Sequence, residues 1–165
     1  MQLNFRDKDE ERAFAEVYDA GPDRARAVVM AAILENRVTA VLQAQMLDDH
    51  AVLTDLFGQQ GPLGNFGAKI RLLHALRIIS HGAYDDLYRV NRIRNEFAHN
   101  PKCRSFADQP VCDLVERLTV WPRGAHAAVQ PRGRERFKLA VSSYIGEMEA
   151  IETRLMAEPL RTPVV

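Results

Sequence analysis

The side chains best suited to chemistry in this sequence lie in one short run, Arg92-Ile93-Arg94-Asn95-Glu96-Phe97-Ala98-His99. A guanidinium, an amide and an imidazole at this spacing can bind an anion or transfer a proton. On a helix, Arg92, Asn95 and His99 share one flank, whereas Arg94 and His99 lie about 140° apart around the axis. Arg94 and His99 therefore reach one small target only if the helix unwinds before His99, which Pro101 permits, or if a second subunit supplies another copy.

The helix that carries this run is expected to cover Ala83–His99, because a proline follows at position 101. At about 100° per residue, one face of this helix collects the apolar residues Ala83, Leu87, Val90, Phe97 and Ala98. Arg94 is predicted to lie in the middle of that face. Burying a guanidinium is costly unless it is paired, so Arg94 is expected either to meet a buried acid or to line a cleft or an interface.

Two family resemblances rest on this run. The segment Arg94-Asn95-Glu96-Phe97-Ala98-His99 resembles the Arg-polar…His motif of the HEPN superfamily (higher eukaryote and prokaryote nucleotide-binding domain). Over residues 20–118 the chain more specifically resembles the bacterial mannitol operon repressor family. The runs that carry the second resemblance are Gly64-Asn65-Phe66-Gly67-Ala68-Lys69-Ile70, Leu76 to Ile79, Asp85-Asp86-Leu87 and Arg92 to His99.

The HEPN resemblance implies a helical bundle and, by analogy, metal-independent RNA cleavage by a dimer. His99 would then transfer the proton of a ribose 2′-hydroxyl or of a leaving oxygen. Arg94 would stabilise charge on the phosphoryl group, and Asn95 would orient the site. A ribonuclease or an RNA-binding protein is therefore the alternative function, and whether the chain is an enzyme stays open.

The mannitol operon repressor resemblance implies transcriptional control, and this is the favoured function. The expected mechanism is the binding of a protein partner or an effector by a homodimer, because the sequence has no helix-turn-helix with a basic recognition helix. The candidate binding residues are Arg92, Arg94, His99 and Lys102. A structural role also stays open, in which Arg94 clamps neighbouring helices while Asn95 and His99 cap the helix end.

The charge composition of the chain narrows the possible functions further. The 22 Lys and Arg residues balance the 22 Asp and Glu residues among 165 residues, which argues against affinity that rests on covering phosphates. The balance is uneven: residues 1–60 carry eleven acids and six bases, whereas residues 88–104 carry five bases and one acid, and residues 117–138 six bases and one acid. Such asymmetry can mark a local anionic partner, although a solvated face is the more usual explanation. Nucleic acid binding remains possible but is not favoured by a net charge of zero.

No cofactor or metal is expected. Cys103 and Cys112 form no C-x-x-C pair, so zinc ligation and a disulfide framework are disfavoured. The glycine-rich stretch at residues 58–67 lacks the lysine that directly follows the last glycine of a phosphate-binding loop. The sequence shows no membrane span and no apolar segment of a secretory signal, so a cytoplasmic protein is expected.

The apolar periodicity predicts a single all-α domain over residues 1–165, a helical bundle with a long second helix and a long last helix. Residues 1–8 and 157–165 are expected to be frayed tails. On the second helix, the predicted apolar stripe begins with Ala25, Val28, Val29 and Ala32. The expected helices are Asp9–Asp19, Pro22–Met46, Asp49–Phe57, Asn65–Ile79, Ala83–His99, Pro110–Leu118 and one that runs through Phe137 to Leu155, after a loop over Thr119–Gly133.

Overall fold

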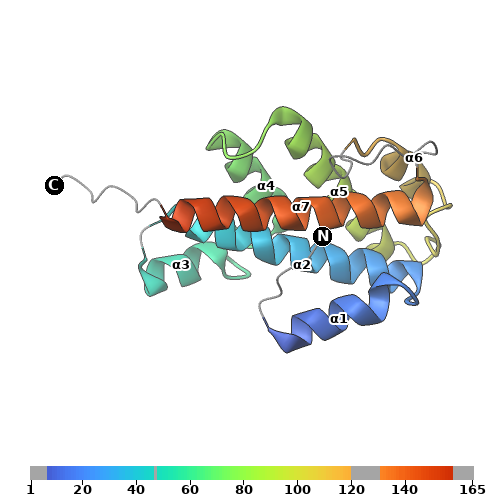
Figure 1. Cartoon of the computed structure of the whole chain (residues 1–165), viewed down its shortest axis with the longest axis horizontal. Coiled ribbons are helices and arrows are strands. Elements are labelled where there is room, and N and C mark those ends of the chain that lie inside the picture. The colour runs from blue at the N-terminus through green and yellow to red at the C-terminus, as the bar shows by residue number, and fades with distance from the viewer. Residues whose placement is uncertain (1–6, 47, 120–130, 158–165) are drawn as a thin grey trace.

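The computed structural model describes residues 7–46, 48–119 and 131–157, and these residues form an all-α bundle of seven helices. The two long helices that the periodicity predicts are present as the second and the last (Figure 1). The helices are α1 (Lys8–Tyr18), α2 (Asp23–Gln43), α3 (His50–Phe57), α4 (Phe66–Ala75), α5 (His81–His99), α6 (Val111–Glu116) and α7 (Gly133–Ala157).

Helices α2 and α7 form the centre of the bundle and run in the same direction side by side (Figure 1). Helix α5 packs on α2, α4 packs on both α5 and α2, α1 lies along α2, and α6 joins α5 to α7. Helix α3 contains no buried residue and extends at one end of the bundle. Helices α2 and α5 are far apart in the sequence but in contact in the fold, and the predicted site lies on α5 at this contact.

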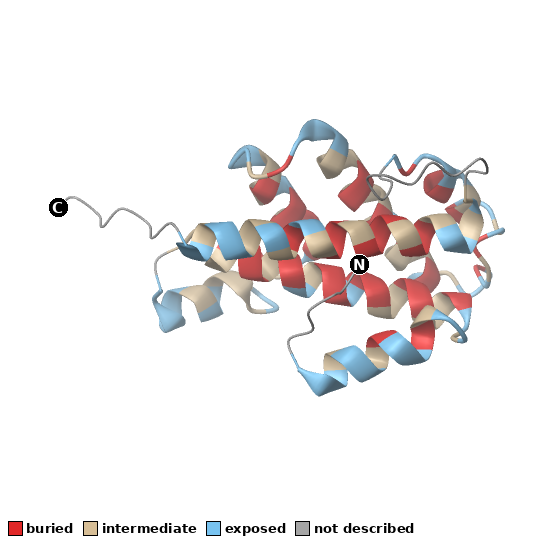
Figure 2. Cartoon of the chain, in the orientation of Figure 1, coloured by how far each residue is buried: buried red, intermediate tan, exposed pale blue. Residues whose placement is uncertain are grey.

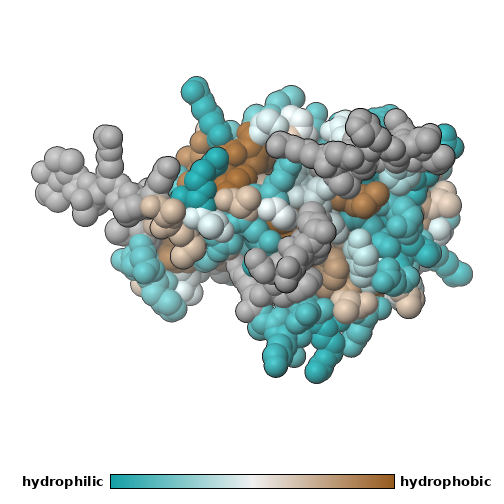
Figure 3. All heavy atoms as spheres, in the orientation of Figure 1, coloured by the Kyte–Doolittle hydropathy of each residue, from teal (hydrophilic) through white to brown (hydrophobic). Residues whose placement is uncertain are grey.

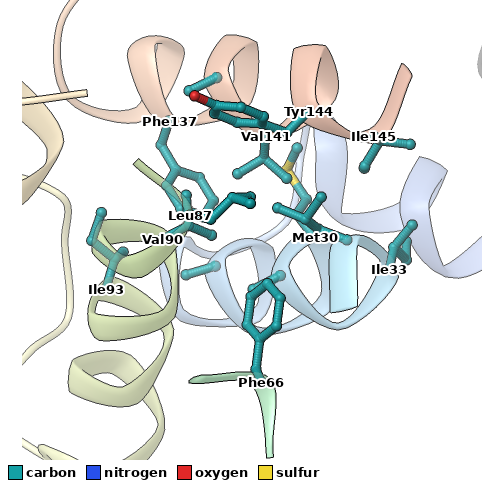
Figure 4. Packing of buried hydrophobic residues seen from close by; sticks show 14 of the residues in the cluster. Met30, Ile33, Phe66, Leu87, Val90, Ile93, Phe137, Val141, Tyr144 and Ile145 are labelled. Carbon is teal, nitrogen blue, oxygen red and sulfur yellow. The ribbon is translucent and has the colours of Figure 1, made fainter. Parts of the chain in front are cut away.

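The core lies between α2, α4, α5 and α7. Figure 4 shows side chains from these four helices converging, and Figure 2 shows that buried residues line their facing sides. The labelled members are Met30, Ile33, Phe66, Leu87, Val90, Ile93, Phe137, Val141, Tyr144 and Ile145, and all of them are buried. Burial of large apolar side chains supplies about 1.5–3 kcal/mol each and is the main force that holds such a bundle together.

Four helices begin at a short polar residue whose side chain accepts backbone N–H groups of the first turn. These residues are Asp7 for α1, Asp49 for α3, Asn65 for α4 and Ser80 for α5. The cap at Ser80 corrects the predicted start of this helix at Ala83. His81 and Gly82 instead form the first turn of α5, because the Ser80 hydroxyl accepts from Ala83 N at 3.2 Å.

Helix α4 is shorter than predicted, since it ends at Ala75 and not at Ile79. Arg77 adopts φ = 58°, in the left-handed region, and Ile78 N donates to Leu73 O at 3.0 Å. This bond pattern closes a helix without glycine and turns the chain towards α5. Apolar residues continue past Ala75 in the sequence, so periodicity alone does not show the end.

The remaining boundaries differ little from the expected ones. Helix α2 starts after Pro22 and ends at Gln43, three residues before the predicted end. Residues 7 and 8 do not belong to the frayed tail expected over residues 1–8, because Asp7 caps α1 and Lys8 is already helical. The rest of the predicted tails, and residues 120–130 of the predicted loop, lie outside the described residues. Among the helices described, none is long and apolar enough to cross a bilayer.

The two cysteines differ in environment, and this predicts different reactivity. Cys103 is buried and Cys112 is partly exposed. Burial, with the nearby carboxylates of Asp108 and Glu96, raises the pKa of the Cys103 thiol. Because the thiolate is the nucleophile, iodoacetamide should alkylate Cys112 about 10-fold faster or more than Cys103 in the folded protein. Mass spectrometry of timed samples measures this ratio, and in urea the two rates should converge. Equal rates in the folded protein would contradict the placement of Cys103.

Candidate functional site

The last turns of α5 are held by an arginine from α2. The Arg24 guanidinium donates to the carbonyl oxygen of Phe97, and also to those of Asn100 and Cys103 at 3.0 and 2.9 Å. The last carbonyl groups of a helix lack partners within the helix and carry partial negative charge, which a cation stabilises. Arg24 therefore fixes the end of α5 against the start of α2.

Arg94 does not lie in the middle of the core face of α5, so that prediction is wrong. The buried face consists of Asp86, Leu87, Val90, Ile93 and Phe97. Arg94 is partly buried beside this face, and Ala98, predicted on the core face, is exposed. The buried face differs from the predicted one because Ala83 and Ala98 are small and tolerate partial or full exposure, whereas Ile93 is fully buried.

Arg94 lines a polar cleft between α2, α4 and α5, which is one of the placements expected for its guanidinium. The other lining residues are Glu35, Gly64, Asn65, Phe66, Gly67, Asn91 and Asn95, and the volume is about 300 Å³. Arg94 Nη1 donates to Asn95 Oδ1 at 2.9 Å, so the two predicted site residues act together in one wall. Among the other lining residues, Glu35 accepts a hydrogen bond through Oε1 from the buried Lys69 ammonium at 2.8 Å.

A second hollow, of apolar character, lies at the other end of the same α2–α5 contact. Pro22, Ala25, Val28, Val29, Phe97 and Ala98 line this groove, with Arg24 and Arg104 at its edges and a volume of about 670 Å³. Phe97 is fully buried and forms the floor, whereas the α2 side chains and Ala98 stay partly or fully exposed. We call this hollow the α2–α5 groove.

The α2–α5 groove corrects a second prediction. Ala25, Val28, Val29 and Ala32 were expected to begin the core stripe of α2, but none of the four is buried and Ala32 is exposed. The core side of α2 instead contains Ala27, Met30, Ala31, Leu34 and Val38. Helix α2 is apolar around much of its circumference, so its periodicity fits two faces, and the packing of α7 selects one of them.

The other predicted site residues are exposed. Arg92, His99 and Lys102 are all solvent-accessible, and neither the cleft of Arg94 nor the α2–α5 groove is lined by them. Among the described residues, Arg94 and His99 therefore line no common hollow. Their separation around a regular helix predicts this result. The homodimer that could bring two copies together stays a prediction.

The two hollows offer two different kinds of binding surface. The polar cleft offers a cation, amides and backbone groups, whereas the α2–α5 groove offers apolar surface with positive charge at its edge. Among the described residues, no group of three or more His, Cys, Asp or Glu side chains is arranged to hold a metal ion.

Sequence reasoning missed the α2 side of both hollows. Glu35 lines the polar cleft 59 residues before Arg94 in the chain, and Arg24 bonds the Phe97 carbonyl 73 residues later; both come from α2. It also missed the buried acid on α5, which is Asp86. Its position, one residue before Leu87, four before Val90 and seven before Ile93, was the available signal, because this spacing puts Asp86 on the core stripe.

The chain is similar to known proteins both in sequence family and in fold. The family model described as "Mannitol repressor" matches residues 16–149. A search of curated protein sequences gives no significant match. The fold is similar to that in the X-ray structure of the MtlR–HPr complex from Escherichia coli, with 17% identity, a TM-score of 0.56, and 89% of this chain and 98% of that chain covered.

A second similar structure is a possible transcriptional regulator, YggD, from Shigella flexneri. The identity is 19% and the TM-score 0.65, with 88% of this chain and 99% of that chain covered. Neither the family nor these two structures is described as a nuclease, so the ribonuclease alternative has no support from them. The match over most of the sequence shows that the chain belongs to the mannitol repressor family of transcriptional regulators.

Proposed function

We propose that this regulator acts in the cytoplasm by binding a protein partner in the α2–α5 groove, and that HPr is this partner. The observation that carries the proposal is the groove itself, an apolar strip of about 670 Å³ that remains accessible in the folded chain. Grooves of this kind are typical sites for an apolar anchor of a partner protein. The Escherichia coli structure named above contains MtlR together with HPr, which supports the choice of partner.

The charges around the groove indicate the chemistry of the partner surface. Arg24 donates to three carbonyl groups and is held in place, whereas the side chains of Arg104, Lys102 and His99 near the end of α5 are exposed. An apolar side chain that fills the groove and acidic groups at its rim would complement this surface. Binding without a DNA-reading helix fits the balanced net charge of the chain.

The test is calorimetric titration of the full chain with HPr from the same genome, with wild type beside Ala98→Asp. Ala98 is exposed in the free protein, so the variant should fold. In the complex the new carboxylate would lose water inside an apolar groove, at a cost of about 1–3 kcal/mol. We therefore expect the Kd for HPr to rise about 10-fold or more.

Ala32→Asp is the matched control, because it makes the same change at an exposed alanine of α2 that does not line the groove. It should leave the Kd for HPr unchanged. Val52→Asp and Leu76→Asp probe two exposed apolar side chains, one on α3 and one at the end of α4. Figure 3 shows hydrophobic surface beside hydrophilic surface where α4 lies in Figure 1. Loss of binding in either of these variants, but not in Ala98→Asp, would overturn the groove as the interface, and a wild-type chain that binds no HPr would overturn the partner.

A further inference from the structure

We propose that the polar cleft between α2, α4 and α5 is a binding site for a small phosphorylated metabolite, with the phosphate group at Arg94. Such a site lies apart from the α2–α5 groove and needs no protein partner. The cleft has a volume of about 300 Å³ and a polar lining. This volume is at the lower end of small-molecule sites, so it fits a phosphate group with a short carbon chain.

The free groups in this cleft are mostly hydrogen-bond donors. Asn65 and Asn95 each use the side-chain oxygen within the protein, for Ala68 N at 2.9 Å and for Arg94 Nη1 at 2.9 Å. Their amide NH₂ groups are therefore the ends left for a ligand. The rest of the Arg94 guanidinium and the Asn91 amide have no hydrogen-bond partner among the described residues. A wall that offers donors and few acceptors selects an oxyanion.

The first turn of α4 adds backbone donors to the same wall. Phe66 and Gly67 line the cleft directly after the cap residue Asn65, where backbone N–H groups lack partners within the helix. Gly67 is buried, and a Cβ built there would lie 3.4 Å from the Asn91 amide nitrogen. This distance is an ordinary van der Waals contact, and it places the Asn91 amide close to the first turn of α4.

Glu35 supplies the acceptor side of the cleft. One of its carboxylate oxygens is bonded by Lys69, which offsets its charge and leaves Arg94 as the uncompensated charge of the lining. The other oxygen can accept a hydrogen bond from a ligand hydroxyl. A phosphate at Arg94 and a hydroxyl at Glu35 together describe a phosphorylated polyol or sugar, and a neutral polyol would lack the first of these contacts.

The experiment is NMR titration of the ¹⁵N-labelled full chain with mannitol 1-phosphate, inorganic phosphate and mannitol. Mannitol 1-phosphate should shift the side-chain amide signals of Asn91 and Asn95, inorganic phosphate should shift the same signals with lower affinity, and mannitol should shift neither. Arg94→Gln should raise the Kd for mannitol 1-phosphate about 10-fold or more, because a charge-assisted bond contributes about 1.5–3 kcal/mol.

Arg92→Gln is the matched control, since it removes the same charge from an exposed position of α5 outside the cleft. Equal loss of affinity in the two variants would show non-specific attraction and overturn the site, as would the absence of any shift in the wild-type spectrum. The Kd for HPr should be unchanged in Arg94→Gln. If that variant instead weakens HPr and the anions do not bind, the cleft belongs to the partner interface and the metabolite site is wrong.

Discussion

Replacing Asp86 with alanine is expected to lower the free energy of unfolding by about 3–5 kcal/mol, although no apolar side chain is removed. The Asp86 carboxylate is fully buried and accepts hydrogen bonds from three parts of the chain. Arg89 Nη1 lies at 2.7 Å, Tyr144 Oη at 3.1 Å, and Thr119 N and Oγ1 at 2.9 and 2.6 Å. The alanine variant leaves the buried Tyr144 hydroxyl without its acceptor, and an unsatisfied buried group carries the full cost of desolvation. It also removes the acceptor that holds Arg89 and Thr119, which are more exposed.

Tyr144 is the most strongly affected of these donors. Burial, followed by the nearby Asp86 carboxylate and their hydrogen bond, raises the pKa of the Tyr144 hydroxyl, which therefore remains a donor through the neutral and alkaline range. Asp86 thus ties α5 to α7 and to Thr119, which lies three residues after the end of α6. Its removal should loosen both connections in one cooperative transition.

Urea denaturation followed by circular dichroism measures this effect, and Asp85→Ala is the matched control. Asp85 is the adjacent carboxylate, but its side chain is 42% exposed and lies 3.7 Å from Arg89. An exposed ion pair contributes about 0–1 kcal/mol, so the control should lose little stability. If the two variants have the same midpoint of unfolding, the carboxylate of Asp86 is not the connection that the structure indicates.

The second large effect is expected for Arg26→Met, which should lower the free energy of unfolding by about 2–4 kcal/mol. Arg26 is fully buried near the start of α2. Its guanidinium donates to Tyr18 O at 3.1 Å, to Asp19 O at 3.1 Å and to Asp23 Oδ1 at 3.0 Å. Methionine retains a flexible apolar stem, so the loss comes from the carbonyl groups at the end of α1 and from Asp23.

Asp23 makes this site a junction between distant segments. Its carboxylate also accepts from Phe106 N at 3.1 Å and from Arg134 Nε at 2.7 Å, so α7 and the connection before α6 meet there. In Arg26→Met we expect faster hydrogen exchange in α1 and around Phe106, besides the lower stability. The same change at the exposed Arg12 of α1 is the control and should alter neither. Unchanged exchange in α1 of Arg26→Met would contradict the role given to the guanidinium.

Neither junction lines the α2–α5 groove or the polar cleft of Arg94. Changes to binding can therefore be separated from changes to stability in the variants proposed above. Ala98→Asp and Arg94→Gln should unfold at nearly the wild-type urea concentration, whereas the Asp86 and Arg26 variants should not. This contrast keeps a loss of binding from being confused with a loss of folded protein.

The sequence by itself determined the helices, their order and the family. Apolar periodicity over long segments needs only local spacing, so it identified α2, α5 and α7 within a few residues at each end. The motif ending at His99 and the run from Gly64 to Ile70 carried the family resemblance without any knowledge of packing. Where local spacing is ambiguous, as at the end of α4, the prediction was wrong because a single left-handed residue, Arg77, closes the helix.

Only the tertiary structure decided which face of each helix is buried and which polar residues lie inside. On α5 the spacing fits a face with Arg94 as well as one with Asp86. Asp86 is buried because Thr119 and Tyr144, 33 and 58 residues away in sequence, bring the donors that its charge requires. The α2–α5 groove has the same origin: Val28 and Val29 are as apolar as the core residues of α2, and they remain partly exposed because α7 packs on the other side. Burial depends on what packs against a helix, and that neighbour is not encoded within the helix itself.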